Sequence, residues 1–293
     1  MKFTVVFSFI LLLTCSIAHA QSAEDNVARL HALYDTTRAR LFREDPRLAS
    51  ADGDKRYNTL WPDLSLGSLQ NIAKENQAAI DELTKISAEG LSATEQLNRE
   101  LFRRWMQNEI DRYRFGEHER PLDQLNYSGS VLTTNETAID IAFDSTKDYE
   151  DWIARLNAVD SFVDQTIALM REGLKHKNVN PRHIMERARK QLKAQLVDNP
   201  DQSPFFEPFK NFPASMSPRD RGQAIGKARI AIRDHVVLSY KRLDTFLEKE
   251  YLPKCRNSVG IWDTPNGADF YRNRIAWFTT TNFSADEIHD IGL

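Results

Sequence analysis

Cysteine is almost absent from this chain of 293 residues, which contains only Cys15 and Cys255. Cys15 lies in an N-terminal segment that has the features of a cleavable signal peptide. A single remaining cysteine cannot form an internal disulfide framework, even in an oxidising compartment. A small disulfide-stabilised scaffold is therefore excluded, and we expect Cys255 to be a buried structural thiol.

Long apolar runs and a strong net charge are also absent. The longest apolar run, residues 5–13, is shorter than the roughly 20 residues that a membrane-spanning helix needs. The formal net charge is −3, and acidic and basic residues are interspersed. A balanced surface of this kind gives no electrostatic reason to expect a nucleic acid or an anionic membrane as partner.

The N-terminus predicts export. Lys2 precedes the apolar run, and Ala18-His19-Ala20 is a small-x-small cleavage site, so we expect a signal peptide over residues 1–20 and a mature domain over 21–293. Cleavage removes one lysine and no acidic residue, which changes the formal net charge from −3 to −4. The mature protein should be periplasmic or secreted. The alternative is a lipoprotein anchored at Cys15, although the threonine before it fits a lipobox poorly.

Apolar spacing predicts a mainly α-helical fold. Helical stripes occur over residues 25–42, 66–86, 92–115, 148–174, 182–196, 218–251 and 268–278. In the helix over 92–115 we expect Leu97, Leu101, Trp105 and Tyr113 to face inward. Short loops separate the stripes, so neighbouring helices should pack in a mostly antiparallel array. Residues 199–218 hold five prolines and four phenylalanines and predict an aromatic loop or short helical turns packed on the core.

Two regions depart from this pattern. Residues 121–134 lack a helical stripe and predict an irregular or short β segment. Ser284-Ala285-Asp286-Glu287 is a capping box that opens a last helix, which has no stop signal before Leu293. A helix of about ten residues is marginal without packing. We therefore expect this helix to continue in polypeptide beyond the sequence.

No established catalytic or metal motif is present. His118-Glu119 lacks the second histidine of a zinc-peptidase helix, because position 122 is leucine and Pro121 would break the helix. There is no nucleophile elbow and no phosphate-binding glycine loop. Lys254 and Arg256 flank Cys255 and could lower the pKa of its thiol, but no histidine is near it in sequence. We predict no catalytic and no metal-binding residue.

The best candidates for binding lie near the end of the chain. Arg272 or Arg274 could hold a substrate carboxylate in a bidentate pair, with Tyr271 as part of a cleft wall. Tyr127, in the irregular segment, could contribute backbone hydrogen bonds to a peptide. The alternative for the aromatic residues is core packing, and for the segment an ordinary loop.

Several stretches together resemble one family. They are L-F-R-E-D-P at 41–46, D-Y-E-D-W at 148–152, A-L-M-R-E-G at 168–173, S-P-F-F-E-P-F at 203–209, E-Y-L-P at 250–253, T-T-T at 279–281 and S-A-D-E-I-H-D-I-G-L at 284–293. Their order resembles the exported bacterial family called domain of unknown function 885, over nearly all of the mature chain.

The resemblance implies a mostly helical, zinc-metallopeptidase-like hydrolase of about twice this length, with its metal motif in the C-terminal half. The first hypothesis is therefore an N-terminal, cleft-forming half, or fragment, that lacks the zinc motif and is inactive alone. Its partners would be a peptide substrate and the missing half. Zinc is expected only in that half. The second hypothesis is a self-sufficient helical module that binds peptides or proteins. The third, an enzyme of another type using Cys255, would require that alkylation of the thiol abolish activity.

Overall fold

The structure is a computed structural model that describes the backbone of residues 3–125 and 130–293 and the side chains of residues 24–125 and 130–293. Within these residues the regular structure is helical, and the one β contact is an isolated parallel bridge between Pro181 and Arg256. The mainly α fold predicted from the sequence is therefore confirmed. No helix in the described part of the chain combines the length and the hydropathy needed to cross a membrane.

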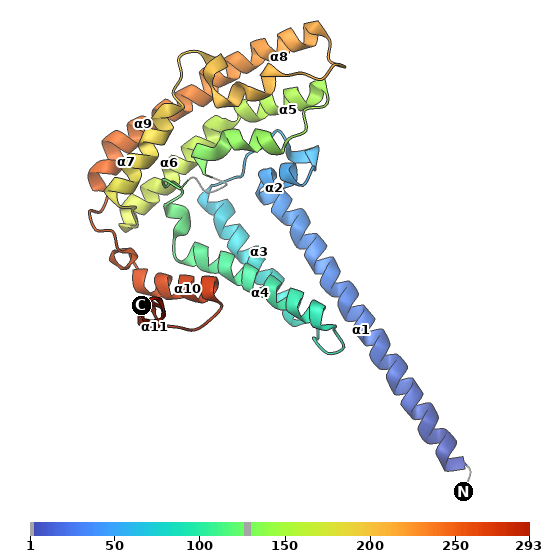
Figure 1. The fold of residues 1–293 in the computed structure, drawn as a ribbon. Helices are drawn as coiled ribbons and strands as arrows, with labels where there is room; N and C mark the ends of the chain where they lie inside the picture. Colours follow the sequence, from blue (N-terminus) through green and yellow to red (C-terminus); the bar gives the residue numbers. More distant parts are fainter. Residues whose placement is uncertain (1–2, 126–129) are drawn as a thin grey trace. The chain divides into compact units, whose positions relative to one another are not determined.

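The described residues form eleven α-helices with short 3-10 and π-helical turns between them (Figure 1). The α-helices are α1 (Phe3–Glu44), α2 (Pro46–Ala51), α3 (Leu66–Thr84), α4 (Ala93–Arg114), α5 (Thr146–Asn157), α6 (Val159–His176), α7 (Arg182–Ala194), α8 (Pro218–Ala231), α9 (Leu238–Phe246), α10 (Gly267–Thr279) and α11 (Ala285–Gly292). Two π-helical turns, η6 (Ile232–Val237) and η7 (Leu247–Tyr251), flank α9.

The chain divides into two compact units. Unit 1 contains residues 1–40 and 71–111, and unit 2 contains residues 41–70 and 112–293. Each has its own hydrophobic core, so each is described by itself.

Unit 1 is an arrangement of three helices, α1, α3 and α4. Arg29 bonds to the backbone near the end of α3 and Arg40 bonds to Asn76, so α1 and α3 run antiparallel. The core between them contains the buried residues Leu30, Ala79, Leu83, Ile86, Leu91, Phe102 and Met106.

The inward face of α4 differs from the prediction. Leu97, Leu101 and Trp105 are 58%, 54% and 40% exposed, whereas Phe102 and Met106 are buried in the core of unit 1. Both sets recur every four residues and lie about 100° apart on the helix. Periodicity alone cannot tell which of two such stripes faces the core, and the prediction chose the wrong one.

Unit 2 is built around two helical rods. The first rod is α5 followed by α6, which meet at Ala158, where one N–H is shared between the carbonyls of Ala154 and Arg155. The sequence predicted this rod as one uninterrupted helix. The second rod is α8, η6, α9 and η7. Because α5 packs on α8 and α6 packs on α9, the rods run parallel.

Helix α7 carries the chain back from the end of the first rod toward the beginning of the second. This return explains why the two rods run parallel. At the start of α7, the backbone N–H of Arg182 donates to the carbonyl oxygen of Arg256. Further along the same helix, the guanidinium of Arg189 pairs with the Asp244 carboxylate at 2.6 Å. α7 therefore runs antiparallel to α9, as short loops predict for neighbouring helices. It brings the chain back so that α8 begins beside α5.

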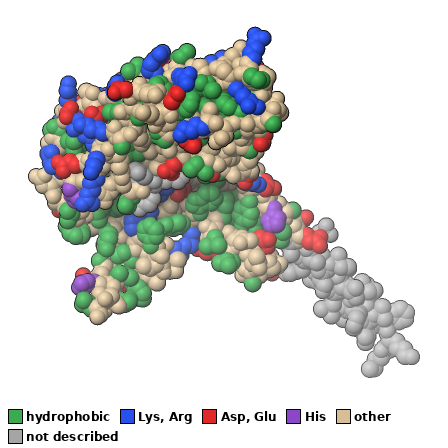
Figure 2. Space-filling view, turned by 45° about the horizontal axis from the view of Figure 1, so that its top comes forward, with side chains coloured by type: hydrophobic (Ala, Val, Ile, Leu, Met, Phe, Trp, Pro, Cys, Tyr) green, Lys and Arg blue, Asp and Glu red, His purple; other side chains and the backbone are tan. Residues whose placement is uncertain are grey.

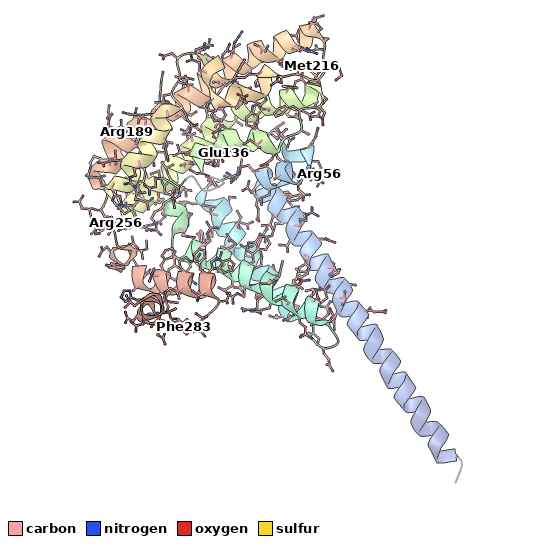
Figure 3. All side chains as sticks on the ribbon, viewed as in Figure 1. Arg56, Glu136, Arg189, Met216, Arg256 and Phe283 are labelled. Carbon is pink, nitrogen blue, oxygen red and sulfur yellow. The ribbon has the colours of Figure 1, made fainter. Side chains whose placement is uncertain are left out.

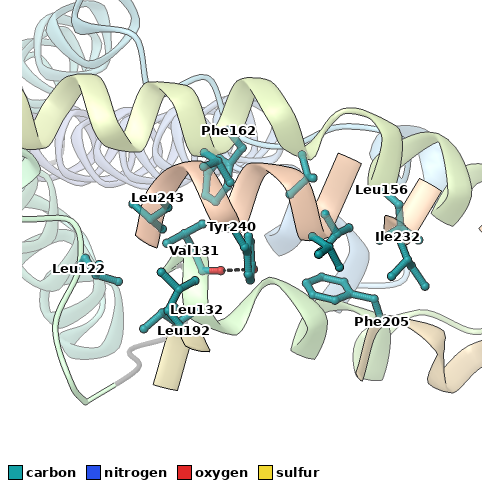
Figure 4. Packing of buried hydrophobic residues seen from close by; sticks show 14 of the residues in the cluster. Leu122, Val131, Leu132, Leu156, Phe162, Leu192, Phe205, Ile232, Tyr240 and Leu243 are labelled. Atoms are coloured by element: carbon teal, nitrogen blue, oxygen red, sulfur yellow. Dashed lines mark hydrogen bonds between the residues drawn. The ribbon is translucent and has the colours of Figure 1, made fainter. Parts of the chain in front are cut away.

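The core of unit 2 lies between the rods and beneath two 3-10 segments, η3 (Val131–Asp140) and η5 (Pro204–Lys210). Tyr240 is fully buried there, and its hydroxyl donates to the Val131 carbonyl at 2.6 Å (Figure 4). Phe205, Phe206 and Phe209 of η5 are buried against the rods. The predicted aromatic segment is thus a short helical turn packed on the core.

A buried arginine attaches α2 and the loop after it to α5. Arg155 is 0% exposed, and its guanidinium donates to Ser50 Oγ at 3.1 Å and to the Tyr57 carbonyl at 2.8 Å. Burial lowers the pKa of Arg155 to about 10. Two of its nitrogen atoms, Nε and Nη1, have no hydrogen-bond partner within the protein, so burying this side chain carries a desolvation cost.

The segment predicted as irregular or short β is irregular where the structure describes it. Residues 121–125 form no helix or strand. Val131–Asp140 forms the 3-10 helix η3, and at its start the Ser130 hydroxyl accepts a hydrogen bond from the Leu132 N–H. The described residues of this segment contain no strand, so the β alternative is not found there. Residues 126–129 lie outside the described residues.

Candidate functional site

One cavity of unit 2 brings together residues from the end of α4 and from the C-terminal helices. It has a volume of about 550 Å³ and is lined by Arg114, Phe115, Asn266, Asp269, Arg272, Asn273, Ala276, Asn282 and Phe283. Four of these residues, spaced three or four apart, form one face of α10. Asn282 and Phe283 come from the turn before α11, where Figure 3 labels Phe283.

The start of α10 is fixed by the turn at Pro265-Asn266-Gly267. Asn266 adopts a left-handed conformation, with φ of 56°, which asparagine tolerates better than most residues. Gly267 follows it, and a Cβ on this glycine would lie 2.0 Å from the Ile261 carbonyl oxygen. Only glycine allows α10 to begin this close to η9 (Ile261–Asp263), so the direction of the helix depends on this residue.

Aromatic and cation–π contacts hold α10 against the chain that follows α4. The ring of Phe270 meets that of Phe115 edge-on at 5.7 Å between centroids. The guanidinium groups of Arg120 and Arg274 lie 5.4 and 5.6 Å from the centre of the Phe270 ring. Both distances are typical of cation–π pairs. Through these contacts, Phe270 joins α10 to the segment that follows α4, and together they form one wall of the cavity.

The charged residues of the lining are two arginines and one aspartate. Arg272 Nη1 donates to Asp269 Oδ1 at 2.8 Å, but these side chains are 73% and 64% exposed. Solvent screens such a pair and makes it weak, so Arg272 can turn toward another carboxylate at little cost.

The predicted binding residues are only partly brought together. Arg272 lines the cavity. Tyr271 is 42% exposed and is not among the lining residues, and Arg274 bonds to Asn273 and stacks on Phe270 instead. Tyr127 lies outside the described residues.

Sequence reasoning missed most of the lining. Asn266, Asp269, Asn273, Ala276, Asn282 and Phe283 are close in sequence to the predicted arginine, and helical spacing from Arg272 would have found Asp269 and Ala276. Arg114 and Phe115 precede them by about 150 residues, and no local pattern connects the two segments.

The sequence match decides the family. The family described as "Bacterial protein of unknown function (DUF885)" matches residues 46–293, which is most of the chain. The chain belongs to the DUF885 family. The resemblance noted from its motifs is thereby confirmed. The comparison with curated proteins gave no match.

A solved structure shares the fold of this DUF885 chain. It is described as "The crystal structure of the putative lipoprotein from Colwellia psychrerythraea" and is 18% identical in sequence, with a TM-score of 0.81. The match covers 92% of this chain and 48% of the other, so this chain spans about half the length of that structure. At this identity the likeness establishes the helical fold alone.

Two histidines of the DUF885 chain, His118 and His176, lie beside Glu119. His118-Glu119 lies in a short 3-10 turn, and His176 Nδ1 bonds to Glu119 Oε1 at 2.6 Å. The other carboxylate oxygen of Glu119 accepts from Asn178 Nδ2 at 2.9 Å. Among the described residues, no three histidine, cysteine or acidic side chains are grouped so that they could hold a metal ion. These residues do not fit a zinc site.

Serine, histidine and aspartate do meet elsewhere, without the geometry of a nucleophilic site. His235 Nδ1 and Ser239 Oγ both bond to Asp160, each at 2.5 Å, and Ser239 also donates to the His235 carbonyl. The hydroxyl thus faces the carboxylate and not the imidazole that would deprotonate it. Burial raises the pKa of Asp160, but hydrogen bonds from Ser239, His235 and Arg242 outweigh it and hold that pKa below its usual value. The cluster joins α6 to the second rod.

Cys255 is a buried thiol, as the sequence predicted. Burial raises the pKa of its thiol to about 11, outweighing the opposing effect of Arg182 and Arg256. The neighbouring basic residues therefore do not activate it as a nucleophile.

Proposed function

We propose that this chain is the substrate-binding, cleft-forming part of an exported, peptidase-like protein, and that peptides bind in the cavity on α10. The observation that carries the proposal is the lining itself. Two arginines, three asparagines and two phenylalanines face one space of about 550 Å³. That volume is within the range of roughly 300–1,000 Å³ found for small-ligand pockets, which suits a few residues of a peptide.

The chemistry of the lining supports a peptide ligand. Asn266, Asn273 and Asn282 each offer an amide that both donates and accepts, which matches the alternating N–H and C=O groups of a peptide. Phe115 and Phe283 offer apolar surface for side chains.

The proposal is tested by measuring peptide binding to the purified protein by fluorescence polarisation, using a panel of labelled tripeptides. Arg272→Gln should weaken binding, because Arg272 lines the cavity. Arg233→Gln, which changes an exposed arginine paired with Asp234 outside the lining, is the matched control and should leave binding unchanged. Failure of every peptide to bind would overturn the proposal.

The peptidase-like part of the proposal concerns polypeptide beyond this sequence. The described residues do not group metal ligands, so we propose that a zinc-binding motif lies outside them, and that this chain alone hydrolyses no peptide. The coverage of only 48% of the Colwellia structure supports a longer protein. Zinc bound at one equivalent, or chelator-sensitive hydrolysis by this chain alone, would contradict the proposal.

A self-sufficient binding module is the second candidate function. It is favoured by the fact that all nine residues of the cavity belong to this chain and to unit 2. Both candidates predict peptide binding. Reading the gene past the last codon separates them: a frame that continues in register into a His-Glu-rich helix supports the first, and a stop codon supports the second.

We propose export because residues 1–20 have the features of a signal peptide. Cleavage by signal peptidase would leave Gln21 as the first residue, whereas a lipoprotein would begin at an acylated Cys15. The Colwellia structure is described as that of a "putative lipoprotein", and the lipoprotein alternative is therefore included in the test. The intact mass of the protein purified from a bacterial host distinguishes the two, and a mass that retains Met1 would contradict export.

A further inference from the structure

We propose that the aromatic face of α10, formed by Tyr271 and Phe278, and the apolar stripe of α11, formed by Ile288 and Ile291, are the surface on which the polypeptide that follows α11 in the longer protein packs. This inference rests on the proposed function, which places this chain within a longer protein. It names the surface that joins the two parts.

Helix α10 has two different sides. One side, which includes Arg272 and Ala276, lines the cavity. Tyr271 and Phe278 are seven residues apart, so they share the opposite side of the helix. Tyr271 is 42% exposed and Phe278 is 77% exposed. The cavity therefore does not account for this pair of aromatic side chains.

Helix α11 carries an apolar stripe that is only partly covered. Ile288 and Ile291 are three residues apart and lie on one side of the helix, whereas Asp286 and Asp290 lie on the other. Ile288 is half-buried, Ile291 is 69% exposed, and no side chain of α11 is buried. A helix of eight residues is marginal unless it packs on a neighbour. The stripe therefore has room for a further packing partner.

The spacing of these residues distinguishes them from ordinary exposed apolar side chains. Apolar residues that are scattered singly over a surface need no explanation. In α10 and α11 they recur at helical spacing, which is the pattern of a helix face that packs on another surface.

Three observations favour the following polypeptide as the occupant. The match with the Colwellia structure covers 48% of that chain, so about half of it has no counterpart here. α11 is the last helix of this sequence, so polypeptide that continues from it starts close to the stripe and is present at a high effective concentration. Asp286, Glu287 and Asp290 make α11 acidic, which disfavours an anionic membrane as the occupant.

The test compares this chain with the longer protein encoded by the same gene. Phe278→Cys and Ile291→Cys place one thiol on each helix, and Cys255 gives little background because it is buried and its pKa is raised to about 11. Maleimide labelling, read site by site by peptide mapping, should be fast at both positions in this chain. In the longer protein it should be about tenfold slower or more, because packing blocks the reagent. Arg233→Cys, at a side chain that is 63% exposed, is the matched control and should label equally fast in both proteins.

Hydrogen–deuterium exchange of the unsubstituted proteins gives a second measurement that does not depend on the folding of the variants. The amides of residues 285–292 should exchange fast in this chain, because a short helix without packing frays. In the longer protein the same amides should exchange about tenfold more slowly or less.

The outcomes separate this inference from peptide binding. Equal labelling and equal exchange in the two proteins would overturn the inference, as would a stop codon directly after codon 293. Protection that appears in this chain alone and increases with protein concentration would identify a second copy as the occupant and overturn it as well. Phe278→Cys should leave peptide binding unchanged, because the cavity lies on the opposite side of α10. Peptide binding can therefore stand if the packing surface fails, and the labelling result can stand if no peptide binds.

Discussion

Replacing Tyr240 by phenylalanine separates the contribution of one hydroxyl from that of the ring in the core of unit 2. The ring is fully buried, and the hydroxyl donates to the Val131 carbonyl at 2.6 Å (Figure 4). Thr134 Oγ1 lies 2.6 Å from the same hydroxyl and 3.1 Å from the Val131 carbonyl oxygen, so in the absence of the Tyr240 hydroxyl its proton can be donated to that carbonyl. The carbonyl therefore keeps a partner in Tyr240→Phe, and the change should destabilise the fold only by the net value of one hydrogen bond, about 0.5–1.5 kcal/mol.

Tyr240→Ala removes the ring as well and should cost about 3–5 kcal/mol, because it leaves a cavity between the rods. Tyr271→Phe is the control, since the hydroxyl it removes belongs to a side chain that is 42% exposed, and it should change the unfolding free energy by less than about 0.5 kcal/mol.

Urea denaturation followed by tryptophan fluorescence measures these differences, and four of the five tryptophans lie in unit 2. A loss of about 1 kcal/mol should lower the melting temperature by roughly 2–4 °C in a chain of this size. If Tyr240→Phe is as damaging as Tyr240→Ala, the hydroxyl and not ring packing holds the rods together, and the reasoning is refuted.

Three further predictions test other parts of the structure. Gly267→Ala should destabilise unit 2 by about 1–3 kcal/mol and abolish peptide binding, because its Cβ would lie 2.0 Å from the Ile261 carbonyl oxygen; an unchanged denaturation midpoint would contradict this. Met106→Ala, at a fully buried position, should cost about 2–5 kcal/mol in urea unfolding. Leu101→Ala, at a 54% exposed position, should change the unfolding free energy by less than about 0.5 kcal/mol, and equal losses would show that the assigned face of α4 is wrong. Because the pKa of Asp160 is lowered from 3.8 in the fold, the carboxylate stabilises the protein above that pH and its contribution is lost as pH falls through the lower value. Asp160→Asn should therefore make stability less steeply dependent on pH below about 4, and identical slopes would exclude the role given to this carboxylate.

Much of the helical fold could be predicted because its signals are local. The capping box at Ser284 and Glu287 is present, and α11 begins at Ala285 beside it. α10 spans Gly267–Thr279, within one residue at each end of the stripe predicted over 268–278. Caps and turns depend on residues within one turn of each other, so they can be read without knowledge of the packing.

What could not be predicted depends on partners distant in sequence. Leu101 and Phe102 are both apolar, and only the packing of α4 in unit 1 decides which is buried. The pairing of His176 with Glu119 joins residues 57 apart. The two segments of the α10 cavity meet through Phe115 and Phe270, whose contact no periodicity reveals.

The surface charges agree with the prediction from composition. On the face that Figure 2 shows, lysine and arginine side chains are intermixed with aspartate and glutamate. On that face the charged side chains form no patch of a single sign. That no nucleic acid binds stays a prediction from composition.

The central claim, that peptides bind in the α10 cavity, is tested most directly by hydrogen–deuterium exchange with and without the free acid Ala-Ala-Phe. We expect the peptide to slow exchange in residues 266–283 and around 112–116, and to leave the buried rods unchanged. Protection confined to other segments, or no protection at saturating peptide, would contradict the claim.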